Sequence, residues 1–229
     1  MLVPLRKSRC RQCYIIRYSP TAPSPAQTGT WSKPLLPQSS MAIRRSNCAY
    51  STARSFPPIY RLKSEETSSD QAVARVAASL AEVLPDAEAL GVKIGLENHD
   101  AFARGAMVAR VLDELPSSSL GAVWDVLHTV RYGEPPEETM RQIGLRLLHV
   151  QIKDGRPDPA ASHPEEWALT LLGEGSVPVP TILALLRTSS YRGAISVEWE
   201  KKWHPELAAP EIALPQHAQV LNRWLSNLT

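Results

Sequence analysis

The nine residues VKIGLENHD, from Val92 to Asp100, pass from a short apolar run to a group of polar side chains. A short, largely apolar run of this kind is typical of a buried strand. A carboxylate, an amide and an imidazole then follow one another as Glu97, Asn98 and His99. A metal-centred acid–base site would explain why such groups stand together at the end of a buried strand, provided that later strands end in the same way.

Three later stretches do end in the same way. In each, an apolar run leads into polar side chains: LGAVWDVLH (residues 120–128), RLLHVQIKDG (146–155) and GAISVEWE (193–200). Before and after these strands, apolar residues recur at helical spacing. The predicted helices cover residues 70–91, 102–115, 135–144, 177–190 and 214–228.

Three details of these helices can be tested by the structure. Pro85 falls inside the first helix and is expected to kink or divide it. Asp100 precedes the second helix and is expected to be its N-cap. The last helix is amphipathic, and His217 is expected to lie on it, as a residue of a surface helix.

Alternating strands and helices predict parallel βαβ units, and nearly continuous apolar strands indicate burial on both faces. Polar residues gather at the C-terminal ends of the strands: Glu97, Asp125, the group 151–154, and Glu198. In a (β/α)8 barrel catalysis takes place at that end, and in an open doubly wound sheet ligands also bind there. No Gly-rich phosphate-binding fingerprint follows any of the strands, so the sequence favours the barrel over a nucleotide-binding sheet.

The composition is that of a soluble α/β protein. The chain has 229 residues, of which 43% are hydrophobic and 21% charged, as is ordinary for a globular protein. No apolar run approaches the roughly 20 residues that a membrane-spanning helix needs. From residue 64 onward the chain is acidic overall, which suits a cytoplasmic enzyme and provides no basic groove for nucleic acid. We therefore expect a cytoplasmic protein that binds neither membranes nor nucleic acid.

Residues 1–66 differ in composition from the rest of the chain. No Asp or Glu occurs before residue 64, whereas Pro, Ser, Thr and basic residues are common and no hydrophobic period is visible. This composition predicts a disordered, basic, low-complexity extension. The alternatives are an organellar transit peptide and a basic tail for nucleic acid. Cys10 and Cys13 form a CxxC pair, but a zinc site needs four ligands and Cys48 is the one further cysteine nearby.

The chain resembles the sugar phosphate isomerase/epimerase family in the order and spacing of GLENHD, WDVLH, HVQIKDG, LLGEGSVPVPTILALLRTSSYRGAISVEWE and KKWHPELAAPEIALPQHAQVLNRWL. Members of this family, which include ketose 3-epimerases, hydroxypyruvate isomerase and inosose dehydratase, have the xylose isomerase-like TIM-barrel fold. The resemblance begins near residue 70 and covers the last four βα units of the eight. It implies that residues 67–229 form a partial barrel domain of the α/β class.

In that family one divalent metal is held at the ends of the fifth to eighth barrel strands. By the resemblance, Glu97, Asp125 and Glu198 occupy metal-ligand positions, and Gln151 stands where His is commonest. The hydroxypyruvate isomerase branch resembles this chain in having Gln there, and an amide oxygen can bind Mg²⁺ or Mn²⁺. His149, two residues earlier on the same face of the strand, is the alternative ligand. The expected cofactor is one divalent metal, Mn²⁺ or Mg²⁺, with Co²⁺ or Zn²⁺ as alternatives.

The resemblance implies proton transfer on a small sugar or keto acid, an α-hydroxy ketone in chemical terms, through an enediolate. A divalent cation on the carbonyl and hydroxyl oxygens would stabilise that species, and two carboxylates on opposite sides can remove and return the proton. The resemblance assigns these catalytic roles to Glu97 and Glu198. The expected substrate-binding residues are His128, His149, Lys153 and Arg156, of which the last two can pair a phosphate or carboxylate.

A complete barrel needs roughly 250 residues, and four βα units make up half of one. A half-barrel would expose two sheet edges, which invites pairing with another chain. Homo-oligomerisation through these edges is therefore one expectation. The alternative to an enzyme is a non-catalytic, truncated relic or interaction module of the same fold. DNA repair of the endonuclease IV type shares the barrel but uses a zinc cluster rich in His, and this chain has Gln151 at the corresponding position.

Each candidate residue also has an ordinary structural explanation. A single carboxylate at a strand end, such as Glu97, commonly caps a turn, and Gln151 can satisfy backbone groups. His149 fits a hydrogen-bonded position in the core. Trp199 and Trp203 can either wall a pocket or pack against the last helix. The prediction of a site therefore depends on the strand ends taken as a set.

Overall fold

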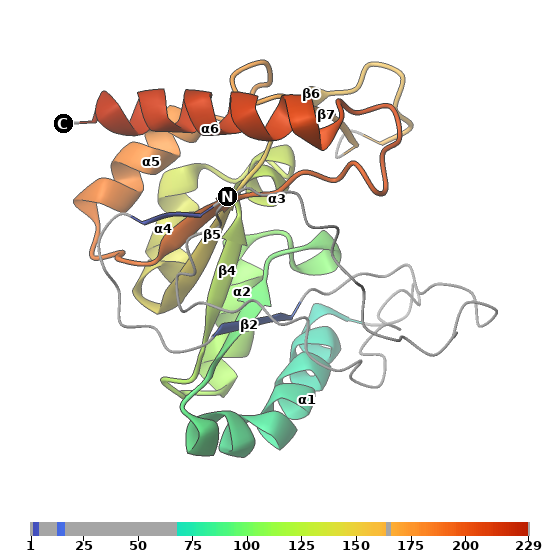
Figure 1. Cartoon of the computed structure of the whole chain (residues 1–229). Helices are drawn as coiled ribbons and strands as arrows, with labels where there is room; N and C mark the ends of the chain where they lie inside the picture. The colour runs from blue at the N-terminus through green and yellow to red at the C-terminus, as the bar shows by residue number, and fades with distance from the viewer. Residues whose placement is uncertain (1, 5–12, 17–67, 164–165, 229) are drawn as a thin grey trace, which may run out of the picture.

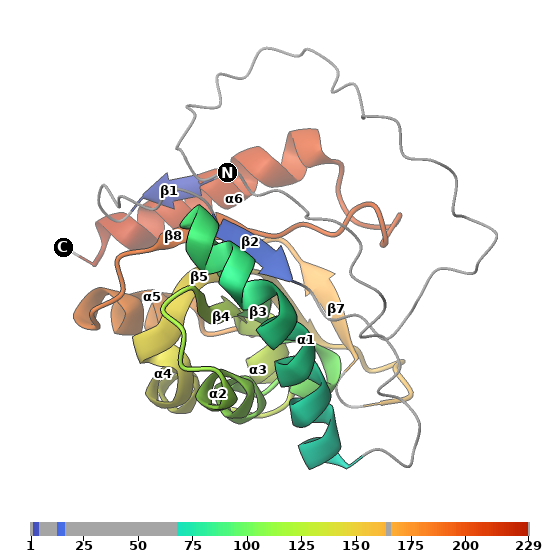
Figure 2. The same ribbon diagram turned by 90° about the horizontal axis from the view of Figure 1, so that it is seen from below.

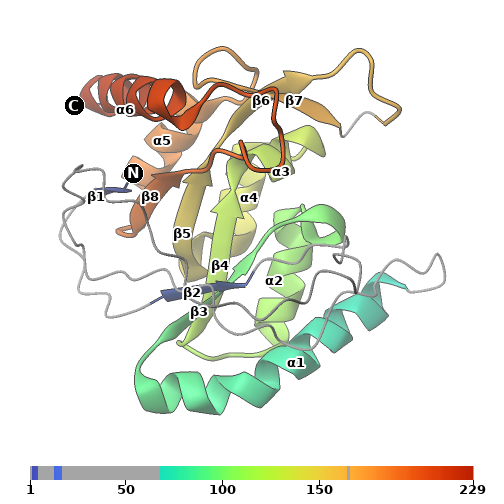
Figure 3. The ribbon, with the colours of Figure 1, turned by 45° about the vertical axis from the view of Figure 1, so that its right-hand side comes forward.

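The computed structural model of the chain describes residues 2–4, 13–16, 68–163 and 166–228. Within these residues one sheet has six strands in the order β1-β8-β5-β4-β3-β2 (Figures 1 and 3). Neighbouring strands from β2 through to β8 run parallel, and β1 joins the far edge in the antiparallel direction. The strands are β1 (Leu2–Pro4), β2 (Cys13–Ile16), β3 (Lys93–Glu97), β4 (Leu120–Asp125), β5 (Leu147–Ile152) and β8 (Ala194–Val197).

The long helices pack one beside the next along this sheet, and the last of them lies beyond the C-terminal ends of β4 and β5 (Figures 1 and 3). They are α1 (Ser69–Leu90), α2 (Gly105–Glu114), α4 (Pro136–Ile143), α5 (Val179–Thr188) and α6 (Pro210–Ser226). They pack in chain order, α1 on α2, α2 on α4, α4 on α5 and α5 on α6, and Figure 2 shows α2, α4 and α5 together on one side of the strands. No helix in the described part of the chain is long and apolar enough to cross a membrane.

This alternation of strand and helix confirms the predicted α/β fold of the barrel type, with four βα units. Short elements complete the connections at the strand ends. The helix α3 (Val126–Arg131) follows β4 directly, and the 3-10 turns η2 (Asp100–Phe102) and η3 (Gly144–Arg146) precede α2 and β5.

The two faces of the sheet have different chemistry, because successive side chains of a strand point to opposite faces. The face toward the helices is buried and apolar, and includes Ile94, Leu96, Trp124, Val150, Ile152 and Ile195. On the other face the strand register pairs Asp125 with Gln151, and Gln151 with Ser196. Parallel strands end at the same edge, so the polar ends of β3, β4, β5 and β8 are brought together there.

Helix α1 starts at a capping box, in which Ser68 and Gln71 bond each other's backbone N–H groups. It continues through Pro85 as one helix and ends at Gly91, whose φ of 64° only glycine adopts readily. The expected division at Pro85 does not occur. Pro85 is exposed, so water can solvate the helix carbonyl that the missing N–H leaves without a donor.

The expected N-cap at Asp100 is wrong. Asp100 lies in the turn η2 with a φ of 44°, and α2 starts later, at Gly105. The Asn98 side chain explains the delay, because its Nδ2 donates to Ala103 O at 3.0 Å and so holds the intervening loop. The N-terminus of α2 is instead capped from outside, since Gly105 N donates to Glu134 Oε1 at 2.8 Å.

Most of the extension predicted over residues 1–66 lies outside the described residues, including Cys10 and Cys48. Two of its segments are described, and both are strands. The backbone of β2 pairs in parallel with β3, and that of β1 pairs antiparallel with β8. Three- and four-residue strands add to an existing edge, and hydrophobic periodicity cannot reveal segments that short.

The predicted strand over residues 146–155 is two strands. The sheet strand β5 ends at Ile152, and β6 (Asp154–Pro157) then forms an antiparallel hairpin with β7 (Trp167–Thr170). Figure 3 shows this hairpin beyond the C-terminal end of β5. The polar group at residues 151–154 therefore stands where the chain leaves the sheet.

The buried carboxylate of Asp154 fastens this hairpin to the loop before α5. Its Oδ1 accepts from Gly155 N at 2.8 Å and Val177 N at 3.2 Å. Its Oδ2 accepts from Gly173 N at 2.8 Å and Gly175 N at 3.1 Å. A Cβ at Gly175 would lie 2.1 Å from Asp154 Oδ1, so the close approach requires glycine there.

We predict that Asp154→Asn lowers the free energy of unfolding by about 2–4 kcal/mol, because charge-assisted hydrogen bonds are lost and an NH₂ group then faces backbone donors. Urea unfolding of the full chain measures the change. Asp158→Asn, at an exposed position of the same hairpin, is the matched control and should change stability by less than about 0.5 kcal/mol. Equal losses in the two variants would contradict the structural role of Asp154.

Candidate metal and substrate site

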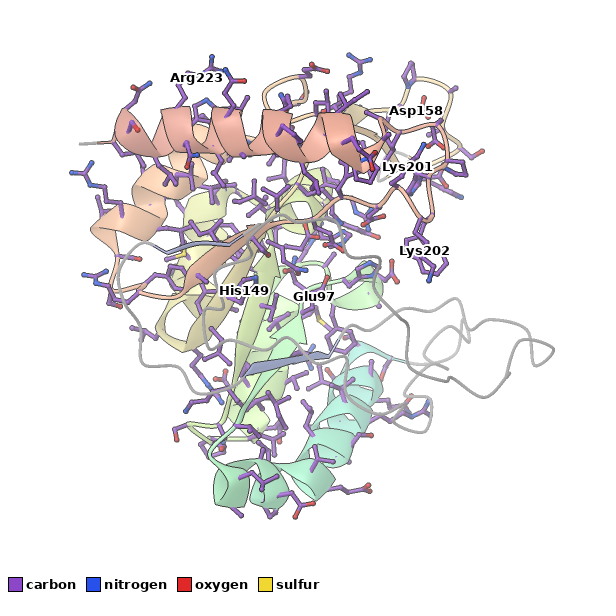
Figure 4. All side chains as sticks on the ribbon, viewed as in Figure 1. Glu97, His149, Asp158, Lys201, Lys202 and Arg223 are labelled. Carbon is purple, nitrogen blue, oxygen red and sulfur yellow. The ribbon has the colours of Figure 1, made fainter. Side chains whose placement is uncertain are left out.

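Glu97, Asp125 and His128 form a buried cluster at the C-terminal end of the sheet. Glu97 ends β3 and is 1% exposed, and Asp125 ends β4 and is fully buried. One ligand atom from each of the three residues lies within 4.8 Å of the others. Figure 4 shows Glu97 on the sheet below the C-terminal helix. The three side chains can therefore reach a single metal ion.

Asp125 has its position because it both ends a strand and starts a helix. Its Oδ1 accepts from Leu127 N at 3.0 Å, which makes it the N-cap of α3. No loop separates β4 from α3, so His128 lies one helical turn after Asp125, with its Nε2 3.4 Å from Asp125 Oδ2. The motif WDVLH thus places a carboxylate and an imidazole at one point.

Asp125 is charged and His128 is neutral. Burial by itself would raise the pKa of Asp125, but attraction to His128 and to the Lys153 ammonium keeps that pKa well below its usual range. Burial lowers the pKa of His128 well below its usual value, and nearby Lys153 lowers it further, against the attraction of Asp125. A neutral imidazole can act as a metal ligand or as a hydrogen-bond partner of a substrate hydroxyl.

Gln151 and Glu198 complete the row of polar strand ends. Gln151 lies beside Asp125 in the β4–β5 register, and its Oε1 is buried without a hydrogen-bond partner among the described residues. Glu198 follows β8, and its backbone N donates to Ile152 O at 3.0 Å. A buried amide oxygen without a donor is the kind of group that a cation satisfies. The oxygen donors present here fit Mg²⁺ or Mn²⁺.

Lys153 lies inside this group of acidic residues rather than at its rim. It is 2% exposed, with its Nζ 2.9 Å from Asp125 Oδ2 and 3.3 Å from Glu198 Oε2. Its Nζ also pairs with Glu200 Oε1. Glu200 was not among the residues predicted from the sequence, although residues i and i+2 of an extended segment share a face and Glu198 was predicted there.

The other predicted substrate-binding residues lie apart from the cluster. His149 is buried on β5, two residues before Gln151, and its Nε2 lies 2.7 Å from Ser196 Oγ on β8. Arg156 is exposed on the hairpin strand β6. Neither is among the residues that the structure groups with Glu97 and Asp125.

A second pair of residues supports His128. The His99 ring meets the His128 ring edge-on at a centroid distance of 4.2 Å, and His99 Nδ1 lies 2.9 Å from Asp100 Oδ2. Arg131 of α3 lies on the other side of that carboxylate, with Nη2 3.9 Å from Asp100 Oδ1. The polar stretch after β3 thus contributes His99 and Asp100 to the surroundings of the cluster, although Asp100 had been expected only as a helix cap.

His217 lies on the last helix, α6, as expected, but its side chain faces inward. His217 is 2% exposed, because it shares the inward stripe of α6 with Ala213, Val220 and Leu221. Leu172 N donates to its Nδ1 at 3.3 Å. The Trp199 ring packs edge-on against it at 4.9 Å, so Trp199 packs against the last helix, whereas Trp203 is 66% exposed.

The family profile described as the xylose isomerase-like TIM barrel matches residues 47–223, well over half of the chain. The chain belongs to this family. The resemblance stated from the sequence motifs is thereby confirmed, and the polar strand ends described above are those of a xylose isomerase-like barrel.

Curated relatives are similar over part of their length. An uncharacterised protein of Methanocaldococcus jannaschii is 29% identical over 152 residues, which are 63% of this chain and 48% of that protein. An inosose dehydratase of Clostridium botulinum is 28% identical over 134 residues, 52% of this chain and 44% of the enzyme. The chain thus spans about half the length of the curated relatives it matches.

Solved structures confirm the fold. The IolI protein, solved with a bound zinc atom, superposes with a TM-score of 0.60 at 20% identity, over 72% of this chain and 60% of that one. L-Ribulose 3-epimerase superposes with a TM-score of 0.59 at 19% identity, over 73% of this chain and 58% of that one. At such identities the likeness establishes the xylose isomerase-like barrel fold alone.

We predict that His149 makes this barrel less stable in acid. Burial lowers its pKa from 6.5 to about 4, so the unfolded chain takes up a proton below pH 6.5 that the folded chain takes up only near pH 4. Stability from this residue is therefore complete above pH 6.5 and falls by up to about 3 kcal/mol as the pH drops to 4.

The difference in unfolding free energy between wild type and His149→Gln, measured by urea unfolding from pH 7.5 to pH 4, isolates this contribution from that of other groups. The variant should lose less stability than the wild type over that range. Parallel pH curves would show that His149 does not titrate as its burial implies.

Proposed function

We propose that the protein is a metal-dependent sugar isomerase or epimerase, which moves a proton on the carbon next to a carbonyl group. The observation that carries this proposal is the convergence of Glu97, Asp125, Gln151 and Glu198, from four adjacent parallel strands, at the C-terminal end of one sheet. Membership of the xylose isomerase-like family supports the reaction class. The inosose dehydratase and L-ribulose 3-epimerase relatives support a carbohydrate or a related keto acid as the substrate.

Glu97, Asp125, Gln151 and Glu198 would hold the metal, with His128 next to them. Carboxylate and amide oxygens are hard donors, so Mn²⁺ and Mg²⁺ are the preferred ions. The zinc atom in the IolI structure is the reason to include Zn²⁺ among the ions tested. When bound, a divalent cation would polarise the carbonyl of an α-hydroxy ketone and stabilise the negative charge of its enediolate.

The positions of Glu97 and Glu198 suit a two-base proton transfer. They lie at the ends of β3 and β8, which the strands β4 and β5 separate in the sheet. A substrate placed over the ends of β4 and β5 therefore has one carboxylate on each side. One can remove the proton and the other can return it, to the neighbouring carbon in an isomerase or to the opposite face in an epimerase.

The remaining polar side chains would bind the substrate. The neutral imidazole of His128 can donate a hydrogen bond to a hydroxyl group while its ring is fixed by His99. Arg156, exposed on β6, is available to a phosphate or carboxylate that reaches outward from the strand ends. His149 lies deeper on β5 and would support Gln151 and Ser196 from below rather than contact the reacting carbons.

We predict that the full chain exchanges a substrate C–H proton with solvent in the presence of Mn²⁺, and that Glu198→Gln lowers the exchange rate at least about 100-fold. Proton NMR in D₂O measures the loss of signal from the carbon next to the carbonyl, with L-ribulose and hydroxypyruvate as the first substrates. Glu206→Gln, at an exposed carboxylate of the same loop, is the matched control and should exchange at the wild-type rate.

Thermal unfolding with and without Mn²⁺ accompanies this experiment, because a ligand that binds the native state alone raises its midpoint. Glu97→Gln should abolish most of the Mn²⁺-dependent rise. A rise in midpoint without exchange on any substrate would favour a non-catalytic relic that keeps its metal site. If the wild type shows neither a Mn²⁺-dependent rise in midpoint nor proton exchange, the proposal is refuted.

A further inference from the structure

Lys153 occupies the same carboxylate oxygens that the proposed metal requires. Its ammonium is 2.9 Å from Asp125 Oδ2 and 3.3 Å from Glu198 Oε2, and both acids belong to the proposed ligand set. The lysine is 2% exposed, so its charge is balanced within the protein rather than by water. A lysine at the rim of the site would instead be exposed to solvent and could bind an anionic substrate.

An ammonium and a divalent ion compete for one buried carboxylate oxygen. Their mutual repulsion is large where water is excluded, and Lys153 Nζ lies against Asp125 Oδ2 and Glu198 Oε2, two oxygens of the proposed ligands. The lysine side chain has a flexible four-carbon stem, which allows its charged end to move while its backbone stays on the strand connection after β5.

Glu200 is an alternative ion-pair partner for the Lys153 ammonium. Its Oε1 already pairs with Lys153 Nζ, and it is not one of the proposed metal ligands. Glu198 and Glu200 are two residues apart, on the segment that follows β8, and both side chains are 17% exposed. A short movement of Nζ toward Glu200 would free Asp125 and Glu198 and still leave the lysine paired.

We propose that Lys153 is an internal counter-ion of the metal site. Its single positive charge offsets part of the negative charge of Asp125 and Glu198 in the metal-free protein, and a divalent ion displaces it toward Glu200. The proposal rests on the proposed function, because it takes Asp125 and Glu198 as metal ligands. It makes the metal affinity of this site lower than its carboxylates alone would give, and it makes the metal-free chain more stable.

The test is a double-mutant cycle of Lys153→Met and Glu200→Gln, with the Mn²⁺ dissociation constant of the metal-stripped full chain as the readout. Lys153→Met removes the competing charge and should tighten Mn²⁺ binding at least about tenfold. Glu200→Gln removes the alternative partner of the lysine and should weaken Mn²⁺ binding at least about threefold. In the Lys153→Met background, Glu200→Gln should weaken binding much less.

The cycle separates displacement from a general field effect. If Glu200 attracted Mn²⁺ only as a distant negative charge, its loss would weaken binding equally with and without Lys153. Lys201→Met is the matched control, because it removes a lysine charge from the same segment, where Nζ bonds the carbonyl of Leu207 rather than a ligand carboxylate. It should change the dissociation constant by less than about twofold.

Lys153→Met leaves buried carboxylates without a cation, so it is expected to unfold at a lower temperature than the wild type when metal-free and to regain stability with Mn²⁺. A variant that folds only with Mn²⁺ would support the proposal. If Lys153→Met folds neither with nor without Mn²⁺, the test is the comparison of Glu200→Gln with the wild type. Unchanged Mn²⁺ binding in Glu200→Gln then overturns the proposal.

Two further outcomes separate this proposal from the proposed function. If the wild type binds Mn²⁺ and Lys153→Met binds it equally or more weakly, Lys153 is no competitor and the counter-ion proposal alone is overturned. If neither protein binds Mn²⁺ while both are folded, the metal site itself is refuted, and with it both proposals. Binding by Lys153→Met alone would show that Mn²⁺ does not displace Lys153 in the wild type, and would overturn the counter-ion proposal.

Discussion

The ion pairs of the Lys153 ammonium with the carboxylates of Asp125, Glu198 and Glu200 are the interaction on which the polar end of the sheet depends. Asp125 is fully buried, and an uncompensated carboxylate in such a place is strongly destabilising. Because Lys153 balances this charge, the protein can keep acids at strand ends that would otherwise have to face water or become protonated. The same balance is what a divalent ion would have to replace.

The side chains of Asn98 and Asp154 hold the backbone around that cluster through hydrogen bonds. Asn98 donates to Asp125 O at 2.9 Å and accepts from Asp125 N at 2.7 Å, so it ties the end of β3 to the end of β4. Asp154 accepts from four backbone N–H groups and ties the hairpin to the loop before α5. Neither residue is proposed to touch the substrate, yet both fix the positions of residues that are, and a site held by backbone contacts keeps its geometry.

The proposed ligands all come from the four βα units that this chain shares with its family. The chain spans about half the length of its curated relatives, and Glu97, Asp125, Gln151 and Glu198 lie within the residues 47–223 that the family profile matches. In the proposed function, the metal ligands and the two bases are all drawn from these residues. Substrate selection is a different matter, since a full barrel surrounds its ligand with loops from eight strands.

The position of the polar side chains at the strand ends was predictable from the sequence, because it depends only on residue type and on where each strand ends. A buried strand that ends in Glu, Asp or Gln must place that group at the common edge of a parallel sheet, and β3, β4, β5 and β8 all follow this rule. Details that the sequence did not reveal arose where a contact with another segment decides the outcome. The Asn98 side chain holds the loop that delays α2, and packing of α6 against Leu172 and Trp199 buries His217.

The sequence by itself therefore determined the α/β class, the family and the identity of the polar strand ends, because periodicity and residue type act locally along the chain. The tertiary structure alone decided that Lys153 lies among the acids and that Glu200 pairs with it. It also decided that two short N-terminal segments add strands to the edges of the sheet. Those features depend on charges and hydrogen bonds between residues far apart in sequence, whose distances no local pattern encodes.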